Sequence, residues 1–147
     1  MSIQAKLQED LKAAMKAKDV VTRDTIRMLK SDLEKAELTK GSELSDGEEI
    51  DVIARAAKTR KESAAQYEEG GRKDLVDKEL AEVAVVERYL PKALSEDEAR
   101  TIIEALAKEL GVTEKKQMGS LIKEAMARNR GQLDGKMASK IAASVLS

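Results

Sequence analysis

The stretch ERYLPKALSEDEA, Glu87–Ala99, ends one helical segment and begins another. Pro91 is the only proline in the chain, and a proline ring removes a backbone donor and disfavours helix in the preceding residue. Leu94, Ser95 and Glu98 follow with the spacing of a helix-starting capping box. We therefore place a domain boundary here, between residues 1–91 and residues 92–147.

Before this boundary, apolar residues recur at helical spacing in four segments. The first two are expected to form a hairpin, and the fourth begins near Asp74. The residues that bound the segments are ones that cap or break helices: Lys18 and Asp19, Gly41, Ser45 with Glu48, the pair Gly70 and Gly71, and Pro91. The faces expected to point inward include Met15, Val21, Met28 and Leu80.

Three shorter helical patterns follow the boundary, and their apolar residues lie within Ile102–Leu110, Met118–Met126 and Ile141–Leu146. Gly111 is expected to cap the first of them. The sequence thus predicts an all-α fold, with an N-terminal helical hairpin or bundle of about four helices and a small C-terminal three-helix domain.

The composition supports helices and excludes several kinds of chemistry. The chain is 41% hydrophobic and 37% charged, with two tyrosines and no Phe or Trp, so its core must be aliphatic. It contains no Cys and no His. Disulfides, the usual zinc sites, cysteine nucleophiles and histidine acid–base schemes are therefore excluded, and we expect no cofactor and no metal.

No apolar run approaches the roughly 20 residues that span a bilayer, and the first residues, MSIQAKLQEDLKAAM, lack the apolar block of a secretory signal. These features lead us to expect a cytoplasmic protein that does not bind membranes.

Charge is unevenly shared along the chain. Seven basic and three acidic side chains lie between Thr113 and Ser147, a balance of +4, whereas the whole chain is −1 and the remainder is therefore −5. A second group of basic residues surrounds the turn near Gly70, and it is either a solvated face or a second nucleic-acid contact. Its members are Lys58, Arg60, Lys61, Arg72 and Lys73.

The stretch RNRGQLDGKM, Arg128–Met137, is superficially similar to a phosphate-binding loop. It has three residues between its glycines instead of four, and Met137 stands where a P-loop needs Ser or Thr. A joint between two helices fits better, with Gly131 closing one helix and Asp134 capping the next. The N–H groups that begin the second helix, beside Lys136, are expected to offer a mild anion contact.

Four motifs, in order and nearly end to end, resemble the YqeY family: TIRMLKSDL, RKESAAQYEEGGRKDL, ERYLPKALSEDEA and QMGSLIKEAMARNRGQLDGKMASKI. This family is similar to the C-terminal tail of the B subunit of glutamine-dependent aspartyl/glutamyl-tRNA amidotransferase, a helical appendage that contacts tRNA. The resemblance implies a tRNA-like partner and a translation-related role. It supplies no active site, so a carbon–nitrogen ligase activity would rest on the shared tail alone.

The leading hypothesis is a non-catalytic helical module that binds tRNA or another structured RNA, and not DNA. Two tyrosines offer few platforms for stacking bases, so contacts to phosphates and to RNA shape are expected. The expected RNA-binding residues are Lys123, Arg128, Arg130, Lys136 and Lys140. The alternative is a protein–protein adaptor for an amidotransferase, a synthetase or another translation factor that docks through an apolar helix face. Catalysis of the amidotransferase type is a third, weaker interpretation.

Overall fold

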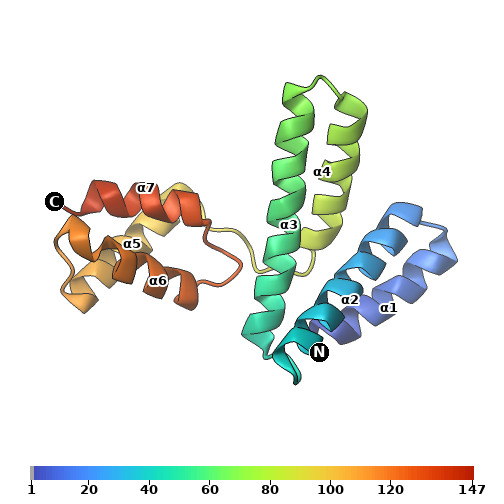
Figure 1. Cartoon of the computed structure of the whole chain (residues 1–147), viewed down its shortest axis with the longest axis horizontal. Coiled ribbons are helices and arrows are strands. Elements are labelled where there is room, and N and C mark those ends of the chain that lie inside the picture. Colours follow the sequence, from blue (N-terminus) through green and yellow to red (C-terminus); the bar gives the residue numbers. More distant parts are fainter. Residues whose placement is uncertain (1) are drawn as a thin grey trace. The chain divides into compact units, whose positions relative to one another are not determined.

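The computed structural model describes residues 2–147, which contain α-helices and no β-strand, so the all-α prediction is confirmed (Figure 1). The chain divides into two compact units, the first ending at Leu90 and the second beginning at Pro91. The N-terminal unit contains α1 (Ile3–Ala17), α2 (Val20–Lys40), α3 (Asp46–Glu69) and α4 (Lys73–Glu87). The C-terminal unit contains α5 (Glu96–Leu110), a short 3-10 helix (Lys115–Gln117), α6 (Met118–Arg128) and α7 (Gly135–Val145).

Side chains at the helix starts satisfy backbone N–H groups that have no partner within the helix. Asp19 caps α2 and Asp134 caps α7, and Ser45 with Glu48 forms the complete capping box predicted for α3. At α5 the box is half formed, because Ser95 accepts from the Glu98 N–H while the Glu98 carboxylate bonds the Ser95 hydroxyl instead of its backbone.

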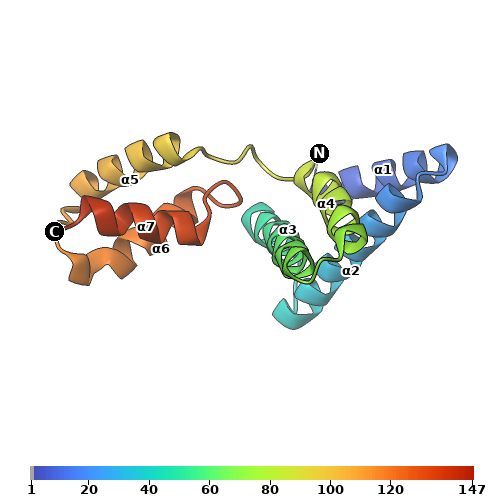
Figure 2. The ribbon, with the colours of Figure 1, turned by 90° about the horizontal axis from the view of Figure 1, so that it is seen from above.

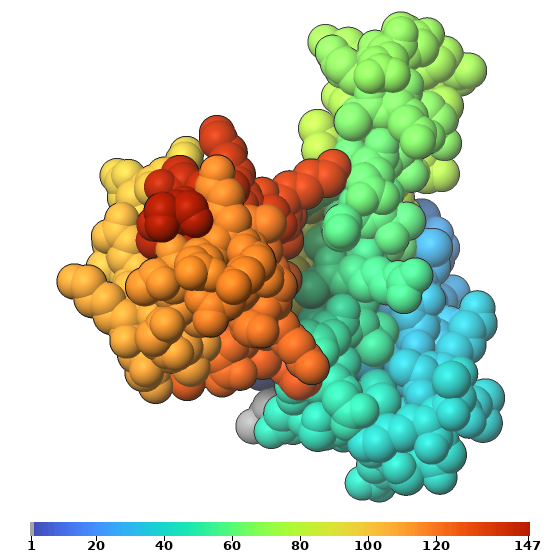
Figure 3. Space-filling view, turned by 60° about the vertical axis from the view of Figure 1, so that its left-hand side comes forward, coloured from blue at the N-terminus to red at the C-terminus, as the bar shows by residue number. Residues whose placement is uncertain are grey.

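The N-terminal unit is built from two helical hairpins, α1 with α2 and α3 with α4, and α2 also packs against α3 and α4 (Figures 1 and 2). The end of the α3–α4 hairpin projects from the rest of the unit, and the space-filling view shows it as a protruding lobe (Figure 3). The buried aliphatic core contains Leu7, Ile26, Leu29 and Ile53. Tyr89, which follows α4, donates its phenolic O–H to the Asp10 carboxylate and so ties the end of α4 to α1.

The prediction of which apolar side chains point inward is partly wrong. Met15, Val21, Met28 and Leu80 were all expected to point inward, but each is about half exposed. The hydrophobic pattern of these helices is wider than the surface that the other helices of the unit cover. The residues that do fill the core lie beside them in the sequence, such as Ala14, Ile26 and Leu29.

The C-terminal unit has its own core, in which Ile103, Leu121, Ala138 and Ile141 are fully buried or nearly so. The segment that enters the unit is fastened to the turn between α6 and α7. The Leu94 N–H donates to the Gln132 carbonyl (2.9 Å), and the Gln132 side chain donates to the Lys92 carbonyl (3.1 Å).

The capping box of α3 predicts that the stability of the protein decreases at low pH. Glu48 accepts from Lys40 Nζ (2.6 Å) and from the Ser45 N–H (3.0 Å), and these bonds lower the pKa of Glu48 to about 2. A carboxyl whose pKa is lower in the folded state stabilises the protein above its unfolded pKa and loses this contribution as the pH falls toward the folded value. We expect wild-type stability to fall between about pH 5 and pH 2 more steeply than that of Glu48→Gln, in urea unfolding followed by circular dichroism. Equal slopes for the two proteins would contradict this assignment.

Candidate nucleic-acid interface

The predicted RNA-binding residues are distributed over α6, the turn that follows it, and α7. Leu121 and Ala125 hold α6 in the core of the C-terminal unit, and Ala138 and Ile141 hold α7 there. Lys123, Arg128, Arg130, Lys136 and Lys140 are all exposed. The local fold therefore keeps all five side chains at the surface, but it does not give them the same environment.

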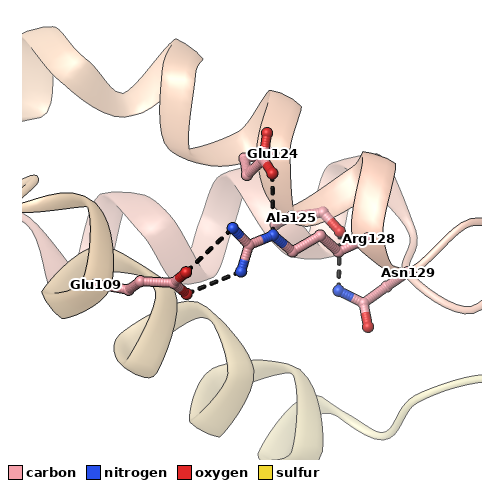
Figure 4. Close-up of polar contacts among 5 residues, drawn as sticks. All are labelled: Glu109, Glu124, Ala125, Arg128 and Asn129. Atoms are coloured by element: carbon pink, nitrogen blue, oxygen red, sulfur yellow. Dashed lines mark hydrogen bonds and ion pairs between the residues drawn. The ribbon is translucent and has the colours of Figure 1, made fainter.

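Arg128 is held by two carboxylates and links α5 to α6 (Figure 4). Its Nη1 and Nη2 atoms donate to the two oxygens of Glu109 at 2.8 and 3.2 Å, and its Nε donates to Glu124 Oε1 at 2.9 Å. These bonds raise the pKa of Arg128 and lower the pKa of Glu109. Three of the five N–H donors of Arg128 are thus engaged by carboxylates whose charge opposes a phosphate, so the main role of Arg128 is to hold α6 against α5.

The lysines lack such partners. Among residues 2–147, no hydrogen bond or ion pair involves the side chains of Lys123, Lys136 or Lys140. Lys136 and Lys140 are one turn apart and so share the exposed side of α7, opposite Ala138 and Ile141. Lys123 lies on another helix, on the side of α6 away from Leu121. These three ammonium groups, together with that of Lys115, are therefore available for an anion.

The expected anion contact at the start of α7 is partly occupied by the protein itself. Asp134 caps this helix, and its carboxylate accepts from the Met137 N–H at 3.0 Å. A second anion there would meet the negative charge of Asp134. Asp134 caps only the Met137 N–H, so the anion contact expected beside Lys136 stays a prediction.

The sequence reasoning overlooked the start of α6, which has no side-chain cap because Gln117 occupies the capping position. Gly119 lies in the first turn and has open space around it, and Lys115 and Lys116 precede the helix. Lys116 pairs with Glu114 at 3.0 Å. The sequence signal was the absence of Ser, Thr, Asp or Asn immediately before Met118.

The basic group near Gly70 does not form a continuous cationic surface. Arg60 is buried, with 7% of its surface exposed. Lys61 pairs with Glu87 at 3.0 Å, and Arg72 pairs with Asp74 at 3.1 Å. These contacts favour the structural interpretation of this group over a second nucleic-acid contact.

Residues 2–147 contain neither a metal-binding cluster nor a membrane-spanning helix. No group of three or more Asp, Glu, His or Cys side chains is arranged to hold a metal ion in this part of the chain. None of its helices combines the length and the apolar character needed to cross a membrane.

Fold and surface together define an all-helical protein of two small units, the second of which carries exposed lysines on α6 and α7. The chain belongs to the YqeY family: the family model described as Yqey-like protein matches residues 4–146. The resemblance stated from the sequence motifs is thereby confirmed.

Curated relatives come from fungi and carry the name Altered inheritance of mitochondria protein 41, mitochondrial. The protein from Kluyveromyces lactis is 36% identical over 106 residues, which cover 69% of this chain and 57% of that protein. The protein from Lachancea thermotolerans is 34% identical over 87 residues, covering 58% of this chain and 46% of that protein. This chain thus spans about half the length of the curated relatives that it matches.

These names overturn the expectation of a cytoplasmic location. Each of these relatives, including the one from Meyerozyma guilliermondii at 33% identity over 84 residues, is named as a mitochondrial protein. The expectation rested on the lack of an apolar signal at the start of the sequence, and such a lack does not distinguish the cytoplasm from an organelle.

Proposed function

We propose that this protein is a non-catalytic helical module that binds tRNA or another structured RNA in a translation-related role, through the lysines of its C-terminal unit. The observation that carries the proposal is the state of Lys123, Lys136 and Lys140, which are exposed and lack carboxylate partners among the described residues. Lysines placed in this way bind phosphates as point charges without first breaking an internal ion pair.

The charge of the surrounding segment supports the same partner. Residues 113–147 carry a balance of +4 within a chain of −1. Because the acidic remainder of the chain repels a polyanion, RNA is expected to approach the C-terminal unit in preference to the rest. Arg130, exposed on the turn after α6, belongs to the proposed surface, and Arg128 supports it by fixing α6 against α5.

The test is a mobility-shift titration of bulk tRNA at several KCl concentrations. The variant Lys123→Gln/Lys136→Gln/Lys140→Gln is expected to bind more weakly, because each lysine that neutralises a phosphate releases about one counterion on binding. If all three contact phosphates, the slope of log affinity against log salt should fall in magnitude by about 2 to 3.

A matched control removes the same charge elsewhere. Lys6, Lys35 and Lys78 are exposed lysines of the N-terminal unit, so Lys6→Gln/Lys35→Gln/Lys78→Gln makes an equal change in net charge. This control should keep the wild-type slope. The proposal is wrong if the wild-type protein does not retard tRNA at low salt, or if both triple variants weaken binding equally.

A further inference from the structure

The free end of the α1–α2 hairpin carries apolar side chains that nothing else in the N-terminal unit covers. We define the arm tip as Met15, Lys16, Lys18, Val20 and Val21. Met15 is 52% exposed, Val20 53% and Val21 46%. A tight turn holds these residues together, because the N–H of Lys18 donates to the Met15 carbonyl. Figures 1 and 2 show this turn pointing away from α3 and α4.

Basic residues surround the arm tip. Lys30 bonds Gln8 across the hairpin, and residues 8–30 contain six basic and four acidic side chains, a balance of +2, whereas residues 1–90 as a whole carry −3. Three of the acidic side chains are already engaged: Asp10 accepts from Tyr89, Asp19 accepts from the N–H and the hydroxyl of Thr22, and Asp24 pairs with Arg23 at 2.8 Å. The six basic residues are Lys12, Lys16, Lys18, Arg23, Arg27 and Lys30.

The backbone at Lys18 is a second, independent observation. Lys18 ends α1 with φ 57°, a left-handed conformation that is unfavourable for a residue with a Cβ. The chain uses glycine for the same geometry at Gly41 and Gly111. Lys16 already supplies a cation to the last turn of α1, so the helix dipole alone does not require a second one. Lysine at this position keeps a cation at the arm tip.

We propose that the arm tip is a docking surface for a partner protein whose own surface presents apolar side chains inside a rim of carboxylates. Half-exposed valines and a methionine gain little from a sugar–phosphate backbone, whereas protein interfaces combine an apolar centre with a polar rim. The unbranched Met15 side chain adapts to a partner, and the surrounding cations steer an acidic surface toward it. This gives the adaptor interpretation a defined surface, independent of RNA binding by the C-terminal unit.

The probe for the test is a synthetic amphipathic helical peptide with Leu on one face and Glu on the other. The intact ¹⁵N-labelled protein is titrated with it, and separately with the same peptide carrying Lys in place of Glu, with vesicles containing anionic lipid, and with bulk tRNA. The Glu peptide is expected to shift amide resonances of residues 14–28, and the Lys peptide is not.

The variant Lys18→Gly/Val20→Ser removes one cation and one apolar side chain. Glycine relieves the left-handed strain and serine is acceptable at the first position of α2, so this variant should fold. It is expected to bind the Glu peptide at least about tenfold more weakly. The control Lys35→Gln/Leu38→Ser changes an exposed basic residue and an exposed apolar residue of α2 outside the arm tip, and should bind like wild type.

Four outcomes would overturn the inference: no binding of the Glu peptide at millimolar concentration, equal binding of the Lys peptide, binding of vesicles without binding of the peptide, or loss of tRNA binding in the arm-tip variant. The triple variant Lys123→Gln/Lys136→Gln/Lys140→Gln separates this inference from the proposed RNA function. It should bind the Glu peptide as wild type does even where it fails to bind tRNA.

Discussion

Leu121→Ala is expected to remove most of the folding stability of the C-terminal unit at 25 °C while the N-terminal unit keeps its own stability. Leu121 is fully buried, and removing a buried leucine side chain costs about 3 kcal/mol. The unit comprises only Pro91–Ser147, and a core of this size supplies on the order of 3 to 5 kcal/mol in total. The N-terminal unit should survive because its buried cluster shares no residue with that of the C-terminal unit.

The two units can be followed separately by their amide resonances and by hydrogen exchange. The matched control is Leu110→Ala, which removes the same atoms from a side chain that is 42% exposed in the same unit. It should leave both units folded. If Leu121→Ala instead unfolded residues 2–90 together with the C-terminal unit, the proposal of two independently folding domains divided near Pro91 would be wrong.

Local signals in the sequence were sufficient for the helices and for most of their ends, although α6 ends at Arg128, before the Gly131 that was expected to close it. Asp19, Ser45 and Asp134 cap helices because a short side-chain oxygen reaches an N–H two or three residues on, and this depends on neighbouring residues alone. Val21 and Met28 show where local reasoning stops. Their spacing places them on an apolar face of the helix. Whether another helix covers that face depends on how the two hairpins pack, and the apolar spacing within one helix does not predict this packing.

The candidate RNA-binding site likewise has features that the local sequence predicts and features that depend on how the helices pack. Exposure of Lys123, Lys136 and Lys140 follows from their positions opposite apolar residues on α6 and α7. Arg128 has a similar position in the sequence, yet its guanidinium is taken up by Glu109, nineteen residues earlier on another helix. A partner of this kind becomes visible only when α5 and α6 are packed together. The count of charges therefore identified residues 113–147 as basic. It could not distinguish Arg128, which carboxylates hold, from the lysines that have no carboxylate partner.

Glu82→Ala is expected to be among the most damaging single substitutions outside the aliphatic core, because it leaves a buried arginine without a counter-charge. Arg60 is 7% exposed, and its Nε lies 4.0 Å from Glu82 Oε2, the one carboxylate within ion-pair distance among residues 2–147. Its Nη1 donates to the Ala56 carbonyl (3.0 Å), Nη2 donates to the Met28 sulfur (3.6 Å), and Nε has no hydrogen-bond partner. Because the pair lies at the limit of ion-pair distance and shares no hydrogen bond, removing Glu82 is expected to cost about 1 to 3 kcal/mol.

The double variant Arg60→Met/Glu82→Met should be close to wild type, or more stable. Two flexible apolar side chains of similar length fill the same space, and neither needs a counter-charge or a hydrogen bond. The measurement is the free energy of unfolding in urea, with the N-terminal unit followed by its amide resonances, for wild type, Glu82→Ala, Arg60→Met, Glu82→Met and the double variant. If Glu82→Ala lowered the free energy of unfolding by less than about 0.5 kcal/mol, the argument would be contradicted, because a loss this small is typical of an exposed ion pair. A double variant that lost as much as Arg60→Met and Glu82→Met combined would also contradict it, because the cost would then come from packing and not from the uncompensated charge.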